Sequence, residues 1–162
     1  MMYSKETPLS EITLQISDDR IAHMHGVAEW MYRHAEEFGC EDKNKMYLLG
    51  LIHDVGYVFG KSNHEQTGAD IIGPGTFLGD LVRNHGLSPK EYMELHGCSE
   101  EEIPRELILL WTADLIVDAK GNTVGFRGRL EDIWDRHGLG SLAYRNCKET
   151  MEWLRVRGYP EK

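Results

Sequence analysis

The hydrophobic residues of this chain recur mostly at intervals of three and four positions, which is the spacing of amphipathic helices. The first such run extends over residues 18–38 and stops at Gly39, a residue type that commonly ends helices. Ser17 precedes the run as an N-cap candidate, and the two acidic residues that follow suit the positive end of a helix dipole. The pattern therefore predicts a long helix over 18–38.

The rest of the chain repeats this pattern, with glycine, proline and capping residues between the periodic segments. Ser-x-x-Glu capping boxes begin at Ser62 and Ser88, and each marks the start of a helix, while Gly56 is expected to end one. Residues 1–16 alternate weakly and indicate a short extended arm, and the Gly-rich residues 121–129 indicate a loop. Since no convincing strand pattern is found, the predicted class is all-α. The further helices are expected at about 42–54, 63–72, 77–85, 89–96, 104–119, 130–137 and 141–157.

At 162 residues the chain is long enough for one domain with a substantial core and short for two. It has no repeat, low-complexity tract or linker, so residues 1–162 are expected to form a single domain. The formal net charge of −9, from 27 acidic and 18 basic residues, argues against a nucleic-acid partner or a polybasic membrane anchor. An anionic substrate is compatible with this charge, because a bound metal or a local basic cluster can reverse the potential inside one pocket.

The sequence also bears on the cellular compartment. Residues 1–10 hold no apolar stretch of signal-peptide length, and no later run approaches the ~18 apolar residues that a membrane span needs. The three cysteines, Cys40, Cys98 and Cys147, are widely spaced and form no Cys-x-x-Cys pair, which fits free thiols in a reducing environment. We therefore expect a cytoplasmic protein without a membrane partner.

The most informative polar residues stand at the end of an apolar run, in residues 48–57. His53 and Asp54 are adjacent there. A buried aspartate is rare without a partner, and a metal ion would satisfy the imidazole and the carboxylate together. A helix end that faces solvent is the alternative interpretation of the same pair.

Other polar residues interrupt apolar helix faces or stand at helix ends in the same way. None of them forms an i, i+4 pair, so their side chains would converge from separate helices. Four imidazoles and two carboxylates suit one metal with open positions, or two metals that share a carboxylate. The six candidate ligands are His23, His53, Asp54, His64, His85 and Asp114. The other histidines are expected outside the site: His25, His34, His96 and His137.

Three short motifs occur in order along the chain: Arg-Ile-Ala-His at residues 20–23, Gly-Leu-Ile-His-Asp-Val-Gly at 50–56, and Thr-Ala-Asp at 112–114. This order on an all-helical chain resembles the HD-domain superfamily of metal-dependent phosphohydrolases. The resemblance covers about residues 18–120. The helices within 130–157 match only as generic helices and are expected to pack on this core.

Two further histidines resemble those of the binuclear members of this superfamily: His64, within His-Glu-Gln-Thr-Gly-Ala-Asp, and His85, within Arg-Asn-His-Gly. The resemblance implies an HD-domain-like bundle of about six to eight helices that binds one or two divalent metals (Fe, Mn, Zn, Mg or Co). Asp54 would bridge to a second metal held by His64 and His85. The first metal would be held by His23, His53, Asp54 and Asp114.

The activity that the resemblance implies is phosphohydrolysis (EC 3.1 class) of a small phosphorylated metabolite, with a nucleotide as the expected substrate. His53 and Asp54 would act through metal-activated water, so no serine or cysteine nucleophile is needed. Many members carry a lysine three residues after the aspartate, where this chain has Tyr57, and this departure puts the cyclic-dinucleotide branch in doubt. Lys61 and Arg83 are candidates to replace that phosphate contact, with an ordinary surface charge as the alternative for each.

Two more arginines, Arg127 and Arg129, belong to the Gly-rich segment after the helix that carries Asp114. They could cover an anionic substrate, or they could pair as surface charges with Glu131 or Asp132. Both interpretations are compatible with the sequence.

Two other functions are compatible with the same ligand set. Some binuclear members with four histidines and two aspartates are mixed-valent di-iron oxygenases that cleave a carbon–carbon or carbon–phosphorus bond. A metal-containing ligand-binding module without turnover is the third candidate, although a purely structural metal needs a closed shell with no open position. The sequence leaves the substrate, the native metal and homo-oligomerisation open.

Overall fold

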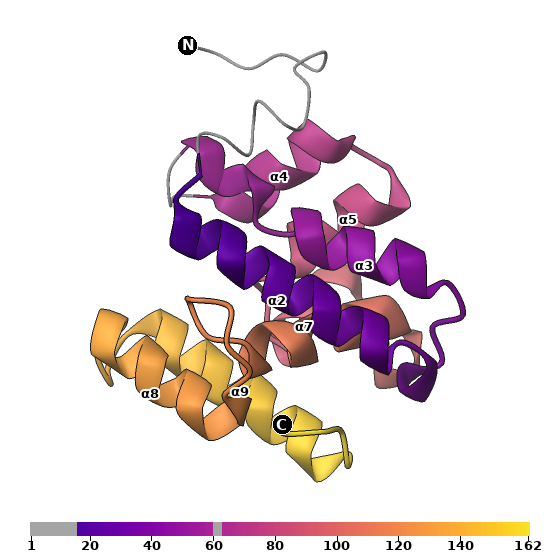
Figure 1. Cartoon of the computed structure of the whole chain (residues 1–162). Coiled ribbons are helices and arrows are strands. Elements are labelled where there is room, and N and C mark those ends of the chain that lie inside the picture. Colours follow the sequence, from indigo (N-terminus) through magenta and orange to yellow (C-terminus); the bar gives the residue numbers. More distant parts are fainter. Residues whose placement is uncertain (1–15, 60–62) are drawn as a thin grey trace.

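The computed structural model describes residues 16–59 and 63–162 (Figure 1). Within these ranges the regular structure is helical, apart from one antiparallel bridge between Val117 and Thr123. The all-α class predicted from the sequence is confirmed. The α-helices are α2 (Asp18–His34), α3 (Lys43–Ile52), α4 (His64–Ile72), α5 (Phe77–Asn84), α6 (Pro89–His96), α7 (Arg105–Ile116), α8 (Gly125–His137) and α9 (Leu142–Val156). The short 3-10 helices are η1 (Glu36–Phe38), η2 (Val55–Phe59) and η3 (Glu100–Glu102).

Helix α7 lies at the centre of the fold. It contacts α2 and α3 on one side, α5 on another, and the pair α8–α9 on a third (Figure 1). Nine of its twelve residues are buried, and a helix covered on all sides has to be apolar nearly all around. After Arg105 and Glu106 at its start, Asp114 near the C-terminal end is the one charged residue of α7, so its surroundings decide what this end of the core can do.

Helices α2 and α3 lie side by side and pack closely because small residues meet at their contact (Figure 1). A Cβ atom on Gly50 would lie 2.6 Å from the Cα atom of Ala28, so glycine is needed there. Ser17 caps α2 by accepting a hydrogen bond from the backbone N–H of Arg20, as its position in the sequence predicts. The close contact brings the middle of α2 against the end of α3.

The predicted end of the helix over about 42–54 is wrong. Helix α3 ends at Ile52, His53 is its C-cap, and the chain continues into η2 instead of stopping at Gly56. Gly56 has a different role: a Cβ atom there would lie 1.8 Å from the carbonyl oxygen of His64. The glycine therefore allows η2 and α4 to approach each other closely.

Other boundaries also differ from the prediction. Helix α7 ends at Ile116 and not at 119, because Val117 is already extended. The predicted loop 121–129 is in part helical, because α8 begins at Gly125. Asn63, with φ of 54°, is the N-cap of α4 and makes no side-chain cap, while Ser62 lies outside the described residues. The first helix ends at His34 and is followed by η1. The predicted arm also lies outside the described residues, except for Ile16, which is buried.

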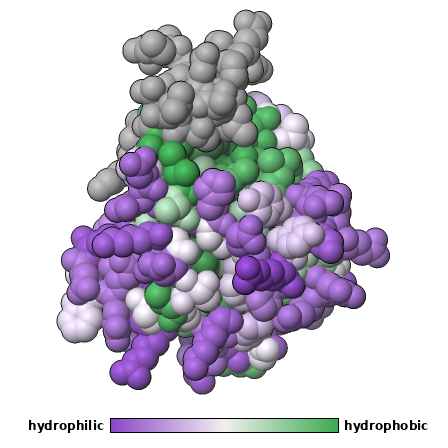
Figure 2. Space-filling view, in the orientation of Figure 1, coloured by the Kyte–Doolittle hydropathy of each residue, from purple (hydrophilic) through white to green (hydrophobic). Residues whose placement is uncertain are grey.

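None of the described helices is both long enough and apolar enough to cross a bilayer. The face shown in Figure 2 is largely hydrophilic in its lower part, where α8 and α9 lie, and hydrophobic residues gather toward the opposite end.

The close approach at Gly56 gives a first prediction. Gly56→Ala is expected to lower the free energy of unfolding by about 2 kcal/mol or more, because the added methyl group overlaps the backbone of α4. Gly140→Ala is the matched control: a Cβ atom at Gly140 meets nothing within 4 Å, so its effect should stay within about 0.5 kcal/mol. Chemical denaturation measures the free energy of unfolding of both variants. Equal values for Gly56→Ala and Gly140→Ala would contradict the close contact at Gly56.

Candidate metal centre

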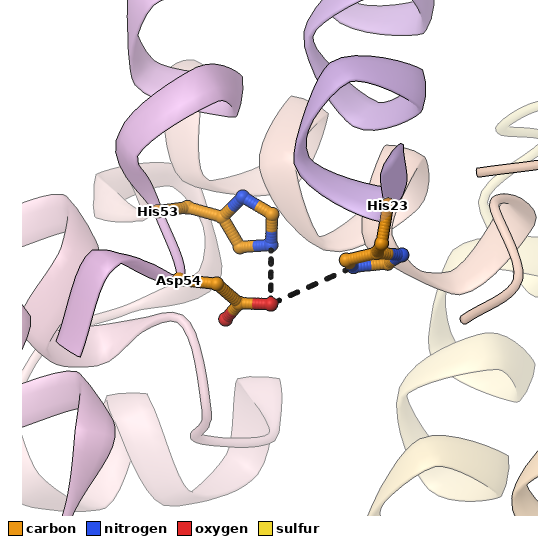
Figure 3. Close-up of side chains that lie close together, drawn as sticks. All are labelled: His23, His53 and Asp54. Atoms are coloured by element: carbon orange, nitrogen blue, oxygen red, sulfur yellow. Dashed lines mark ion pairs between the residues drawn. The ribbon is translucent and has the colours of Figure 1, made fainter. Parts of the chain in front are cut away.

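Three of the predicted ligands meet where the end of α3 faces α2. His23 projects from α2, His53 is the C-cap of α3, and Asp54 follows in the turn (Figure 3). The Asp54 Oδ2 atom lies 3.3 Å from His53 Nε2 and 3.7 Å from His23 Nε2. His23 and His53 are fully buried and Asp54 nearly so.

Asp114 of α7 completes this group from the centre of the fold. Its Oδ1 atom lies 2.8 Å from His23 Nε2 and 3.5 Å from His53 Nε2. Two imidazoles and two carboxylates therefore converge at one point. The Asp114 side chain is 25% exposed, so this point borders on space that a small molecule can reach.

The other oxygen of Asp54 faces a second pair of imidazoles. Asp54 Oδ1 lies 3.5 Å from the Nε2 atom of His64, at the start of α4, and 3.4 Å from that of His85, the C-cap of α5. Each oxygen of one carboxylate thus belongs to a different group of ligands. This is the arrangement expected of a carboxylate that bridges two metal ions.

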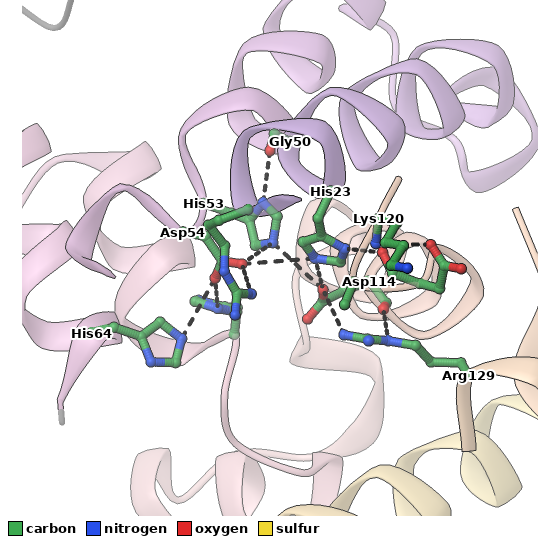
Figure 4. Close-up of polar contacts among 12 residues, drawn as sticks. His23, Gly50, His53, Asp54, His64, Asp114, Lys120 and Arg129 are labelled. Atoms are coloured by element: carbon green, nitrogen blue, oxygen red, sulfur yellow. Dashed lines mark hydrogen bonds and ion pairs between the residues drawn. The ribbon is translucent and has the colours of Figure 1, made fainter. Parts of the chain in front are cut away.

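Backbone carbonyl groups fix the orientation of three imidazoles (Figure 4). The Nδ1 atom of His53 lies 2.6 Å from the Gly50 carbonyl oxygen, and that of His85 lies 2.5 Å from the Val82 carbonyl oxygen. These carbonyls belong to the last turns of α3 and α5, where the regular backbone N–H donors four residues further on are missing. His23 Nδ1 likewise contacts the Asp118 carbonyl oxygen, at 2.8 Å.

This arrangement sets the protonation of the rings. A carbonyl oxygen can only accept a hydrogen bond, so each Nδ1 atom carries a hydrogen and donates it. The Nε2 atom of a neutral ring then directs its lone pair at the carboxylates. Metal-binding histidines have the same combination of a donating outer nitrogen and a free inner nitrogen.

One buried atom tests whether a metal fits here. Within the described part of the chain, His53 Nε2 is buried and has no hydrogen-bond partner. Buried polar atoms without partners are rare in folded proteins, and a metal ion would satisfy this one. Imidazole nitrogens together with carboxylate oxygens form a donor set that suits divalent iron, manganese or zinc. The residues present therefore fit a divalent metal.

The carboxylates and imidazoles shift one another's pKa values. Burial alone would raise the pKa of Asp54 and Asp114, but the neighbouring imidazoles hold both pKa values well below the usual range. Burial alone would lower the pKa of His53, but the charges of Asp54 and Asp114 raise it to about 10. The metal-free cluster therefore retains protons that a metal would displace.

Arg20 and Tyr57 connect the two groups of ligands. The Arg20 Nη1 atom donates to Asp54 Oδ2 at 2.9 Å, and its guanidinium group lies 3.9 Å above the centre of the Tyr57 ring. The Tyr57 ring in turn stacks on His64, with 4.1 Å between ring centroids. The tyrosine that replaces the lysine of many family members thus packs between a cation and a candidate ligand. The sequence shows Arg20 only as part of the Arg-Ile-Ala-His motif, without indicating its contact with Asp54.

A cavity of about 350 Å³ opens from the cluster toward α8 and α9. The candidate ligands Asp54, His64, His85 and Asp114 belong to its lining, and α7 adds Trp111 and Leu115. Helices α8 and α9 contribute much of the remaining wall, with Arg129, Ile133, Arg136, Leu142, Asn146 and Thr150.

The arginine and lysine candidates lie in different surroundings. Arg129 is buried beside Asp114 and lines the cavity, whereas Arg127 is exposed and lies 3.7 Å from Glu131. Arg83, on α5, is not among the residues that line the cavity. Lys61 lies outside the described residues.

The four histidines expected outside the site are absent from the groups of potential ligands among the described residues. His25 is exposed on α2, His34 stacks on Trp30, and His96 contacts Asn84. His137 is among the residues that line the cavity.

The fold and the cluster together define an all-α protein with a His/Asp centre that can hold a divalent metal. The family model described as HD domain matches residues 20–116, which is more than half of the chain, so the protein belongs to the HD-domain family. The resemblance inferred from the sequence is thereby confirmed. Members of this family are mostly metal-dependent hydrolases that bind divalent metals. Comparisons with curated proteins and with solved structures found no match.

The shared carboxylate gives a second prediction. Asp54→Ala is expected to remove both metal ions, because each oxygen of Asp54 belongs to a different group. His64→Ala or His85→Ala should remove mainly the second. Elemental analysis of the purified variants counts the metals. Asp70→Ala, an exposed change on α4, is the control. Full metal content in Asp54→Ala would show that the centre is assigned wrongly.

The raised pKa of His53 gives a third prediction, on metal-free protein. Because the pKa of His53 is higher in the folded protein than its ordinary value of 6.5, the bound proton stabilises the fold fully below pH 6.5. This stabilisation is lost as the pH rises toward the folded-state pKa of about 10. The melting temperature of chelator-treated protein should therefore fall from pH 6.5 to 10 more steeply than that of metal-loaded protein, in which a metal replaces the proton. Parallel pH profiles by differential scanning fluorimetry would contradict this.

Proposed function

We propose that this protein is a metal-dependent phosphohydrolase that acts on a small phosphorylated metabolite, most favourably a nucleotide. The observation that carries the proposal is Asp54, whose two oxygens face two different pairs of imidazoles. His23, His53, Asp54 and Asp114 would hold one metal, and Asp54, His64 and His85 the other. A divalent metal in such a site polarises phosphoryl oxygens and lowers the pKa of bound water.

Two cations of the chain support an anionic substrate. Arg20 lines the cavity beside Asp54, and Arg129 lines it beside Asp114. Both guanidinium groups are mostly buried, where an electrostatic contact is screened less than at the surface. The chain as a whole carries a net charge of −9, so these cations create a local environment that the overall charge does not predict.

The part of the cavity that is lined by α7, α8 and α9 supports an organic group on the substrate. Trp111, Leu115 and Ile133 provide apolar wall, while Asn146 and Thr150 add polar groups. A cavity of about 350 Å³ that combines apolar and aromatic side chains with convergent polar groups has the size of a small-ligand site. We propose that the substrate's phosphate lies at the cluster and its organic part between α7 and the α8–α9 pair.

The same donor set makes a di-iron oxygenase the second candidate. Four imidazoles and two carboxylates that share Asp54 suit a pair of irons as well as a pair of hydrolytic metals. We retain as proposals, from the sequence, a single domain in the cytoplasm with no nucleic-acid or membrane partner.

The fourth prediction tests the proposed activity. Anaerobically purified protein should contain about two metals per chain and release phosphate from members of a nucleotide panel, while Asp54→Ala should release none above background. Elemental analysis and a phosphate assay on the same sample measure both. Two irons with oxygen uptake and no phosphate release would favour the oxygenase. Tight nucleotide binding without turnover would favour the non-catalytic module.

A further inference from the structure

Arg129 of α8 is a buried arginine that is held in place by several contacts. Its Nε atom donates to the Asp114 carbonyl oxygen at 3.1 Å, and its Nη1 atom donates to Asp132 Oδ2 at 2.7 Å. Its side chain is 8% exposed. Since a buried charge is expensive unless it is paired, Asp132 is the partner that allows it to be there.

The third nitrogen of the same guanidinium group is turned to the candidate centre. Arg129 Nη2 lies 4.0 Å from Asp114 Oδ1, beyond hydrogen-bond distance, and the residue lines the cavity. Two edges of the guanidinium group are therefore used by the protein. The remaining N–H groups are near the Asp114 carboxylate, which Figure 4 shows beside Arg129, and the residue lines the cavity.

Asp132 is itself fixed, so the orientation of Arg129 does not depend on one flexible contact. Asp132 Oδ2 accepts a hydrogen bond from the backbone N–H of Ala119 at 3.2 Å and lies 3.4 Å from Arg136 Nη2. The segment after α7 and two turns of α8 thus hold the guanidinium group together. A donor held in advance stabilises charge better than one that must reorganise.

Arg20 occupies the corresponding position at the other carboxylate. Its Nη1 atom donates to Asp54 Oδ2, and it too lines the cavity. Arginine side chains match the geometry of phosphate oxygens with parallel N–H groups. The cavity therefore has one planar cation beside Asp54 and one beside Asp114.

We propose that Arg129 is a substrate-binding residue that contacts the anionic group of the substrate, and that Asp132 positions it. Arg129 lies outside residues 20–116, which the HD-domain model matches, so α8 would complete a site whose candidate ligands all come from the matched region. The identification of this anion as a phosphate rests on the proposed function. The competing role is structural, in which Arg129 merely anchors the end of α7 through the Asp114 carbonyl.

The test uses inorganic phosphate as the probe and the Mn²⁺-loaded full chain as the protein. Arg129→Gln should weaken phosphate binding by about 10-fold or more in isothermal titration calorimetry, the loss expected for one charge-assisted contact. Its metal content should remain that of the wild type. Arg127→Gln is the matched control, because Arg127 is an exposed arginine on the same helix and does not line the cavity; it should bind phosphate normally.

Two milder variants keep the test decisive if Arg129→Gln does not fold. Arg129→Lys retains the charge but loses the planar pair of donors, and Asp132→Asn removes the anion that orients the guanidinium group. Each should weaken phosphate binding by about threefold or more, a partial loss of one charge-assisted contact, without loss of metal. The proposal would be overturned if both variants bound phosphate with wild-type affinity. It would also be overturned if metal were lost together with phosphate binding, or if the wild type bound no phosphate.

The anion site at Arg129 and the proposed hydrolase activity can be refuted independently. Phosphate binding that depends on Arg129, in a protein that hydrolyses no nucleotide of the panel, would support the anion site and refute the hydrolase. Nucleotide hydrolysis with unchanged phosphate affinity in Arg129→Gln would refute the anion site and support the hydrolase.

Discussion

The buried carboxylate of Asp54 is the constraint on which the rest of this structure depends. An ionised carboxylate away from water is strongly unfavourable unless charge and hydrogen bonds compensate it. Here Arg20, His23 and His53 approach one oxygen, and His64 and His85 approach the other. Removing one of these groups would weaken this compensation, so the elements that carry them are tied together through one residue.

Local chain geometry supplies much of the required order. His53 and His85 both stand at helix C-caps, and each ring contacts a carbonyl group three residues earlier, at Gly50 and Val82. These carbonyls lie in the last turn of a helix, where regular i+4 donors run out, so the same contact helps to satisfy the helix end and orients the imidazole. Two separate helices thus present the same kind of ligand by the same means.

The chain divides its functions between two regions. The region matched by the HD-domain model supplies the six candidate ligands, and α7 delivers Asp114 to the centre of the fold. Helices α8 and α9 supply much of the remaining cavity wall, with a buried arginine and both apolar and polar side chains. In the proposed function, the first region would supply the metal chemistry and the second would contribute to the size and charge of the ligand site.

The sequence by itself determined what depends on short-range signals. Helical periodicity gave the all-α class, the capping residues Ser17 and Ser88 marked helix starts correctly, and polar residues in apolar surroundings identified six side chains that do converge. Only the tertiary structure decided the role of Gly56 and the burial of Arg129, which the sequence placed at a helix end and in a loop. Both depend on contacts between separate elements: the backbone of η2 approaches α4, and Arg129 donates to the Asp114 carbonyl oxygen of α7. Such contacts leave no periodic pattern in the chain.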